Sequence, residues 1–241
     1  MLKIKLNKET KNIVLFIFNY VVKFTLTKRS LKNIILEIEN YNKLEKSIFF
    51  KDYLVPSFKV RFFFIMAKYS MISKKEEKFF FKEYLNRFNK ELANNEKNID
   101  KYLDFEKTKK FIQLHLPIYE DTLYNLISNS KIIITPCHGD LHPGNIVKNN
   151  NKYFLIDWGL YNQNGCFIFD LINYKIFSSK YYKNDWFLFL IKYHKKYIKF
   201  LDQKYFDLYV IWKIENELKT VKLTEFKIEK YKNILKSFFK S

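Results

Sequence analysis

Three oxygen-bearing side chains lie close together in the middle of the sequence. Asp140 and Asn145 belong to the stretch HGDLHPGNIV, and Asp157 follows in LIDWG. Phosphoryl transfer to a hydroxyl group needs a carboxylate that orients the nucleophile and accepts its proton, and a Mg²⁺ ion that neutralises the phosphate charge. A loop that carries Asp140 and Asn145 can present a base and one metal ligand together. A hairpin after this loop can then return Asp157 to the same cleft.

All four glycines of the chain fall in this region. Glycine is needed where the backbone takes a positive φ or where atoms approach closely, so the clustering indicates a site with demanding geometry. Amide and carboxylate oxygens suit Mg²⁺ and are poor ligands for Zn²⁺, so we do not expect His138 and His142 to form a zinc pair. The four glycines are Gly139, Gly144, Gly159 and Gly165.

The composition predicts a folded, soluble, cytoplasmic protein. Hydrophobic residues make up 48% of the 241 residues, which is enough for a packed core. No apolar run reaches the roughly 18 to 20 residues that span a bilayer, and the first residues lack the apolar core of a signal peptide. Cys137 and Cys166 are too few for a disulfide framework and have no zinc spacing, which is typical of a reducing compartment.

The formal net charge of +19 is strongly basic. Nucleic acid, anionic lipid and anionic substrates all attract such a charge. The lysines are scattered, however, and only three of the 44 basic residues are Arg, which is the residue most used for bidentate contacts to phosphate or bases. We therefore interpret the charge as a solvated basic surface and do not expect a nucleic-acid partner. Peripheral contact with an anionic membrane stays open.

The first part of the chain has the pattern of a small antiparallel β-sheet that carries one helix. MLKIKL, IVLFIF and VVKFTL are short apolar segments separated by polar breaks, which predicts three strands. SLKNIILEIENYNKLEK has helical spacing, with Ser30 as its expected N-cap. FKVRFFFIMAKY, which follows, predicts further strand.

Beyond residue 70 the pattern becomes mainly helical. Ser73 and Glu76 have the spacing of a capping box at the start of a helix. We expect a second helix over 99–115 and a third that starts at Pro117. KIIIT predicts a short strand, and NIVKNNNKYFLID predicts a hairpin around its asparagines. Beyond Asp170 the chain is expected to be helical, with aromatic stripes at 185–200 and 205–218 that would lie in the core.

HGDLHPGN followed by LIDWG resembles the catalytic signature of the aminoglycoside phosphotransferase and choline kinase families, which are relatives of protein kinases. The resemblance implies a two-lobed α+β fold of the protein-kinase type, with a small antiparallel β-sheet lobe and a mainly helical lobe. Residues 1–69 would form the β-rich nucleotide-clamp lobe, and residues 70–241 the catalytic and acceptor-binding lobe. It also implies transfer of the γ-phosphate of ATP or GTP to a hydroxyl of a small polar acceptor, such as choline, a sugar or an aminoglycoside.

The same resemblance implies roles for the residues of the motif. Asp140 would be the catalytic base, and Asn145 and Asp157 would hold Mg²⁺ or Mn²⁺. His138 would brace the loop. His142 stands where related kinases often carry a residue near the transferred phosphate, so it would contact phosphate or substrate, or else pack the loop.

Outside the motif, three further residues match the family pattern. Lys23 lies in the third strand, as the phosphate-binding lysine of the family does, and Glu37 lies in the helix that follows. Asp170, in FDL, matches an aspartate that ties the catalytic loop to the next helix; the alternative is a simple helix N-cap.

The sequence also departs from the family pattern in two places. NKETKN, where a phosphate-covering turn is expected, has no glycine, and the first lobe is short. The segment between Asp157 and Asp170 is too short for a regulated activation loop of the protein-kinase type, which favours a small-molecule acceptor. Two other hypotheses remain. One is a pseudokinase that binds a nucleotide or partner without turnover, and the other is a nucleic-acid binder that uses basic charge with interleaved aromatic residues.

Overall fold

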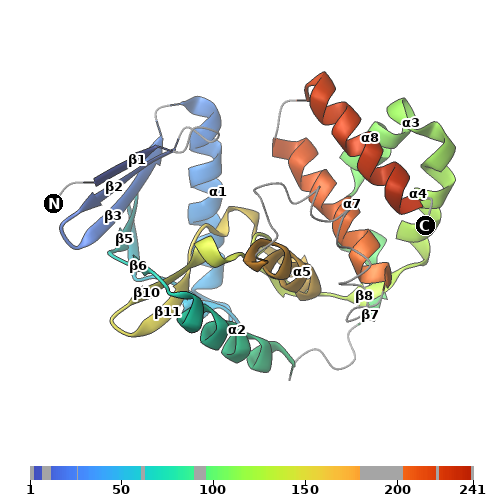
Figure 1. Cartoon of the computed structure of the whole chain (residues 1–241). Coiled ribbons are helices and arrows are strands. Elements are labelled where there is room, and N and C mark those ends of the chain that lie inside the picture. Colours follow the sequence, from blue (N-terminus) through green and yellow to red (C-terminus); the bar gives the residue numbers. More distant parts are fainter. Residues whose placement is uncertain are drawn as a thin grey trace. The chain divides into compact units, whose positions relative to one another are not determined.

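The computed structural model of the chain contains two compact units, each of which is built from two segments (Figure 1). The first unit combines Met1–Glu91 with His138–Asn162, and the second combines Leu92–Cys137 with Gln163–Ser241. The lobe boundary at residue 70 stays a prediction. The structure describes residues 3–6, 12–25, 27–60, 63–89, 96–179, 203–220 and 223–239. Most of the NKETKN turn and the aromatic stripe at 185–200 lie outside the described residues.

The first unit contains a five-stranded antiparallel sheet, which confirms the predicted β-rich start of the chain (Figure 1). Its order is β1-β2-β3-β5-β4. Val21 and Lys23 of β3, and Phe64 and Met66 of β5, are buried on one face of the sheet, because alternate residues of a strand point to the same side. The strands are β1 (Lys3–Leu6), β2 (Asn12–Ile17), β3 (Tyr20–Thr25), β4 (Ser57–Val60) and β5 (Phe63–Ala67).

Helix α1 (Lys28–Leu44) contacts β3 and β5. Its buried face includes the apolar residues Ile34 and Tyr41. The prediction of Ser30 as N-cap is wrong, because the helix begins two residues earlier. The backbone N–H of Leu31 donates to the carbonyl of Thr27 at 3.0 Å, so Thr27 occupies the capping position.

After a 3-10 turn, η1 (Lys51–Tyr53), and the last strands of the sheet, the chain enters helix α2 (Lys74–Asn89). The predicted capping box is present at its start. The backbone N–H of Ser73 donates to Glu76 Oε2 at 2.9 Å, and the N–H of Glu76 donates to Ser73 Oγ at 3.3 Å. Lys148 also bonds Glu76, at 2.7 Å, which ties the start of α2 to the hairpin described next.

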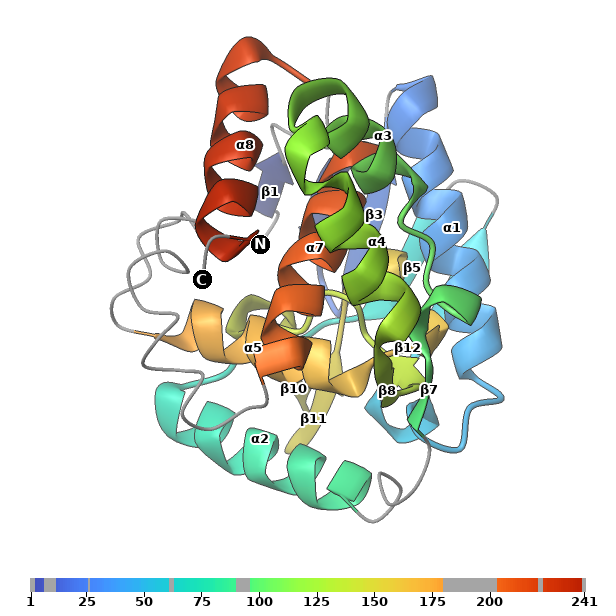
Figure 2. The ribbon, with the colours of Figure 1, turned by 90° about the vertical axis from the view of Figure 1, so that its right-hand side faces the viewer.

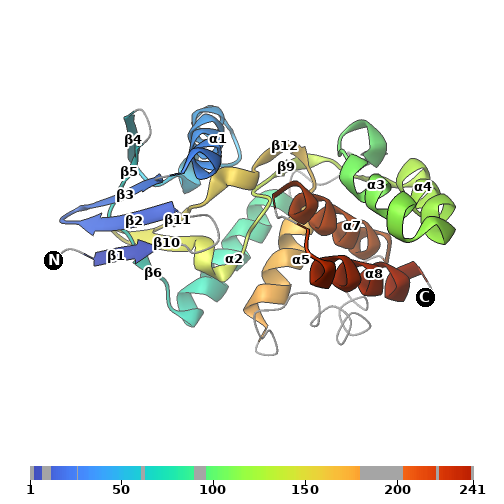
Figure 3. The ribbon, with the colours of Figure 1, turned by 90° about the horizontal axis from the view of Figure 1, so that it is seen from above.

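The predicted hairpin is confirmed as β10 (Ile146–Asn149) and β11 (Lys152–Leu155). Asn150 and Asn151 form its turn with φ of 44° and 63°, a left-handed conformation that asparagine tolerates well. The short strand β6 (Ser70–Met71) pairs with β10 on the side away from β11 (Figure 3). The hairpin therefore belongs to the first unit although it follows most of that unit's residues by more than fifty positions.

The second unit is mainly helical, as predicted. Helices α3 and α5 both contact α7 (Figure 2). The stripe predicted at 205–218 is buried, including Tyr209 and Ile214. The described elements of the second unit are β7 (Glu96–Asn98), η2 (Ile99–Lys101), α3 (Glu106–His115), η3 (Pro117–Tyr119), α4 (Glu120–Asn129), β8 (Lys131–Ile133), β9 (Thr135–Cys137), α5 (Phe167–Ser178), α7 (Gln203–Thr220) and α8 (Glu225–Phe239). Strand β12 (Asn162–Gly165) pairs with β9.

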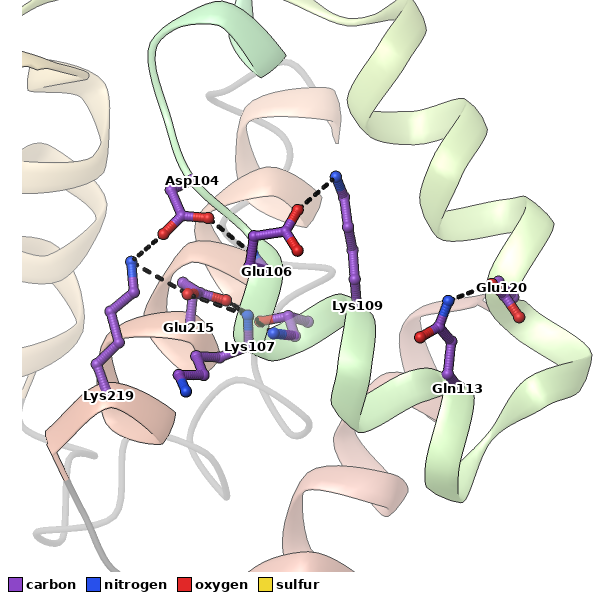
Figure 4. A network of polar contacts seen from close by, with 9 residues as sticks. Asp104, Glu106, Lys107, Lys109, Gln113, Glu120, Glu215 and Lys219 are labelled. Carbon is purple, nitrogen blue, oxygen red and sulfur yellow. Dashed lines mark hydrogen bonds and ion pairs between the residues drawn. The ribbon is translucent and has the colours of Figure 1, made fainter.

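The predicted helix over 99–115 is wrong in its first half. A 3-10 turn covers the first residues, and α3 begins only at Glu106. A polar network explains where the helix starts (Figure 4). Asp104 Oδ1 accepts the N–H of Glu106 at 2.9 Å, and Glu215 of α7 accepts the N–H of Thr108 at 2.7 Å. Anionic groups stabilise a helix at its N-terminus, so these two carboxylates fix the first turn.

Lys219 completes this network, because its Nζ lies 3.0 Å from Asp104 and 3.1 Å from Glu215 (Figure 4). Glu215 is only 1% exposed, so its charge is balanced within the unit rather than by solvent. In the part of the chain that the structure describes, no helix has both the length and the apolar character needed to cross a bilayer.

Candidate active site

Three residues that lie far apart in the sequence meet in the first unit. Lys23 Nζ of β3 lies 2.5 Å from Glu37 Oε2 of α1, and it also bonds Asp157 Oδ1. The side chains of Lys23 and Glu37 are 11% and 4% exposed, whereas that of Asp157 is 56% exposed. A buried ion pair therefore holds one oxygen of a carboxylate that still faces solvent.

The charges of these three groups depend on one another. Burial by itself disfavours the charged form of Lys23, but Glu37 and Asp157 outweigh it, and the pKa of Lys23 is raised. The ammonium in turn lowers the pKa of Asp157. Burial raises the pKa of Glu37 more than Lys23 lowers it. Lys23 and Asp157 are therefore both charged at neutral pH.

The backbone around Asp157 has an unusual conformation that side chains hold in place. Asp157 has φ 66° and ψ 55°, in the left-handed region, just before the 3-10 turn η5 (Trp158–Leu160). The indole N–H of Trp158 donates to the carbonyl of Leu155 at 3.0 Å. The fully buried indole packs against Phe50, with ring centroids 5.1 Å apart. The turn that presents Asp157 is thus anchored in an aromatic core.

The loop with Asp140 and Asn145 is tied to the hairpin by hydrogen bonds. The N–H of Ile156 donates to the carbonyl of Asn145 at 3.0 Å, which places Asn145 and Asp157 at the same end of the hairpin. Asn145 Nδ2 donates to the carbonyl of Asp140 at 3.0 Å. Because the amide nitrogen is used in this way, the amide oxygen is the atom that can serve as a ligand for a hard cation.

His138 is fully buried beneath this loop. Its Nε2–H donates to the carbonyl of Ile156 at 3.0 Å, and its Nδ1 accepts the N–H of Asp140 at 3.3 Å. The ring also packs on Trp158, with centroids 4.4 Å apart. These contacts join the loop to the hairpin and need the neutral imidazole, in which one nitrogen donates and the other accepts.

The burial of His138 predicts a loss of stability in mild acid. Burial lowers its pKa to about 4, below the ordinary value of 6.5. Between these two values the unfolded chain binds more protons, so stability falls as the pH falls, by about 1.36 kcal/mol per pH unit and roughly 3 kcal/mol in total. Urea unfolding from pH 7 to 4 should show this decline, and a His138→Gln variant should lack that component. Parallel pH curves for the two proteins would contradict the assignment.

His142 is positioned beside the side chain of Asp140. Its Nδ1 accepts the N–H of Gly144 at 3.0 Å, and its Nε2 lies 3.7 Å from Asp140 Oδ2. The two side chains are 26% and 32% exposed. The histidine thus packs the loop and also lies beside the carboxylate of Asp140. A contact with phosphate stays a prediction.

The glycine cluster has a steric reason at Gly139 but not at every position. Gly139 has φ +83°, and a Cβ there would lie 2.0 Å from the carbonyl oxygen of Leu160. No side chain can be added at this position without moving the backbone. A Cβ at Gly159, in contrast, would meet nothing within 4 Å.

Asp170 lies in the second unit, in the first turn of α5, and is fully buried. Its alternative interpretation as a helix N-cap is wrong, because Cys166 occupies that position. The proposed tie to the catalytic loop stays a prediction.

Asn40 is a residue of the site that the sequence did not reveal. It is 3% exposed, and its Nδ2 donates to the carbonyl of Trp158 at 2.9 Å. Its position one helical turn after Glu37 places both side chains on the same face of α1. The sequence does show this spacing between Glu37 and Asn40, but a polar residue on a helix usually faces solvent, so the spacing alone did not mark Asn40 as part of the site.

The chain is similar to solved structures of known enzymes. No protein-family model matches the sequence, and no curated protein matches it. Choline kinase LicA from Streptococcus pneumoniae is 18% identical with a TM-score of 0.56, and the match covers 100% of this chain and 94% of that one. The chain has a protein-kinase-like fold. The two-lobed α+β prediction and the resemblance read from HGDLHPGN and LIDWG are thus confirmed at the level of the fold.

Two aminoglycoside phosphotransferases share this protein-kinase-like fold. APH(2'')-Ib, bound to ADP, is 21% identical with a TM-score of 0.58, and the match covers 99% of this chain and 94% of that one. The ternary complex of APH(2'')-IIa with streptomycin and ATP is 17% identical with a TM-score of 0.59, covering 99% and 93%. The chain therefore shares its fold with solved structures from both families whose signature the motif resembles.

Proposed function

We propose that the protein is a phosphotransferase that moves the γ-phosphate of ATP or GTP to a hydroxyl group of a small polar acceptor. The observation that carries the proposal is the meeting of Lys23, Glu37 and Asp157 in one compact unit, which also holds the loop with Asp140 and Asn145. The solved structures with this fold support the same type of reaction, because they are a choline kinase and aminoglycoside phosphotransferases.

In this proposal each residue has one task. Lys23, held by Glu37, binds the phosphates of the nucleotide. Asp140 orients the acceptor hydroxyl and takes its proton. The oxygens of Asn145 and Asp157 fit Mg²⁺ or Mn²⁺, which neutralises phosphate charge when bound. No cluster of three or more His, Cys, Asp or Glu side chains in the described ranges is placed to hold a metal, so the remaining ligands would be water and phosphate oxygens.

The acceptor would be an amino alcohol such as choline, a sugar, or an aminoglycoside. The short segment between Asp157 and Asp170 favours such molecules over a protein acceptor. A pseudokinase without turnover is the alternative, favoured by the short first lobe and the missing glycine. A nucleotide-consumption screen against amino alcohols, sugars and aminoglycosides separates the two. Turnover with any acceptor supports the phosphotransferase, and nucleotide binding with no turnover in the whole panel supports the pseudokinase.

Metal dependence tests the proposed ligands directly. We expect activity to require Mg²⁺ or Mn²⁺ and to stop in excess chelator, since Asp157 and Asn145 would bind a metal through their oxygen atoms. Asp157→Ala should abolish turnover and remove the gain in ADP affinity that Mg²⁺ provides, measured by calorimetry. Asp121→Ala, at an exposed position of α4, is the control and should behave like the wild type. Full activity in chelator, or an unaffected Asp157→Ala variant, would contradict the assignment.

A further inference from the structure

Helix α1 makes a second contact with the site, separate from the pair of Lys23 and Glu37. Asn40 Nδ2 donates to the carbonyl of Trp158 at 2.9 Å and also lies 3.5 Å from the carbonyl of Gly159. Asn40 is almost fully buried, so its amide cannot exchange this bond for one to water. The contact joins α1 to the backbone directly after Asp157.

That backbone needs support. Asp157 is not a glycine, yet its φ is 66°, a sparsely populated conformation that its surroundings must hold. The indole of Trp158 fixes the turn on one side through the carbonyl of Leu155. Asn40 fixes it on the other side through the carbonyl of Trp158, the residue that follows Asp157. Rotation about the Asp157 backbone would break the Asn40 bond, so this bond, together with the bond from Lys23 to Oδ1, holds the carboxylate in its direction.

We infer that Asn40 is a positioning residue for the metal-binding carboxylate of Asp157. The inference rests on the proposed function. It also implies that α1 serves both halves of the site, because Glu37 and Asn40 lie one turn apart on one helix face. Glu37 positions Lys23 for the nucleotide phosphates, and Asn40 positions Asp157 for the metal that those phosphates share.

The test compares two nearly isosteric substitutions on one helix. Asn40→Asp replaces the donating amide with a carboxylate that faces two carbonyl oxygens. Asn33→Asp makes the same chemical change at an exposed position of α1 and is the control. A neutral second variant, Asn40→Leu, removes the donor without adding charge. For each protein, calorimetry measures the affinity for ADP with Mg²⁺ and with chelator, and thermal unfolding measures stability.

We expect the gain in ADP affinity from Mg²⁺ to fall by about 10- to 100-fold in both Asn40 variants, as is usual when the support of a metal ligand is removed. ADP affinity in chelator should stay near that of the control. Equal losses with and without Mg²⁺ would show that Asn40 only holds the fold, and would overturn the inference. So would Asn40 variants that retain the full Mg²⁺ effect. A wild-type protein whose ADP affinity does not respond to Mg²⁺ would overturn the proposed function as well, so the two failures are distinct.

Discussion

Replacement of Asp140 by Asn is expected to lower turnover by roughly 10²- to 10⁴-fold while nucleotide affinity is retained. The substitution preserves the shape of the side chain but removes the atom that would accept the proton of the acceptor hydroxyl. The local structure should survive, because Asn145 bonds the backbone carbonyl of Asp140 and His138 bonds its backbone N–H. The loss corresponds to about 3 to 5 kcal/mol of transition-state stabilisation at 1.36 kcal/mol per decade.

The experiment measures turnover with an acceptor found in the screen and ADP affinity by calorimetry on the same preparation. Asp121→Asn, at an exposed position of α4, is the matched control. Unchanged turnover in Asp140→Asn, with Asp157→Ala inactive, would show that Asp140 is not the base. Parallel losses of turnover and nucleotide affinity would instead indicate damage to the loop rather than removal of a base.

Features of the fold that depend on neighbouring residues could be predicted from the sequence. The asparagine turn of the hairpin and the capping box of Ser73 and Glu76 each use residues within a few positions of one another. The approach of Lys23 and Glu37 to Asp157 was accessible only through the resemblance, because the contact between Lys23 and Asp157 spans 134 positions. No local pattern reports such a contact.

The features that could not be predicted depend on partners far away in the chain. Asn40 bonds a carbonyl 118 positions later, and nothing in the helical pattern distinguishes it from a solvated asparagine. The start of α3 was misplaced because helical spacing continues across residues 99–105. The actual start depends on Asp104, two residues before Glu106, and on Glu215, which bonds Thr108 from 107 positions away. A distant hydrogen-bond partner thus contributes in both cases, and the periodic pattern does not show it.

Lys23→Met is expected to lower the free energy of unfolding by about 3–5 kcal/mol, because it leaves the buried carboxylate of Glu37 without its counter-ion. Glu37→Gln should cost less, since Lys23 keeps its bond to Asp157. The double variant Lys23→Met/Glu37→Leu replaces the pair with apolar side chains and should recover most of the lost stability. Nucleotide binding should be lost in both variants, because both lack the lysine that we propose to bind the phosphates. Urea unfolding measures stability, and Lys28→Met, at an exposed position of α1, is the control.

The pH dependence of Lys23→Met distinguishes an uncompensated charge from a simple packing defect. Burial already raises the pKa of Glu37 in the intact protein, and removal of Lys23 should raise it further. A group whose pKa is higher in the folded state than in the unfolded state contributes stability at low pH and loses it as the pH rises through the folded pKa. The stability difference between Lys23→Met and the wild type should therefore shrink as the pH falls from 7 towards 5. A difference that stays constant over this range would mean that lost packing, rather than the buried charge of Glu37, destabilises the variant.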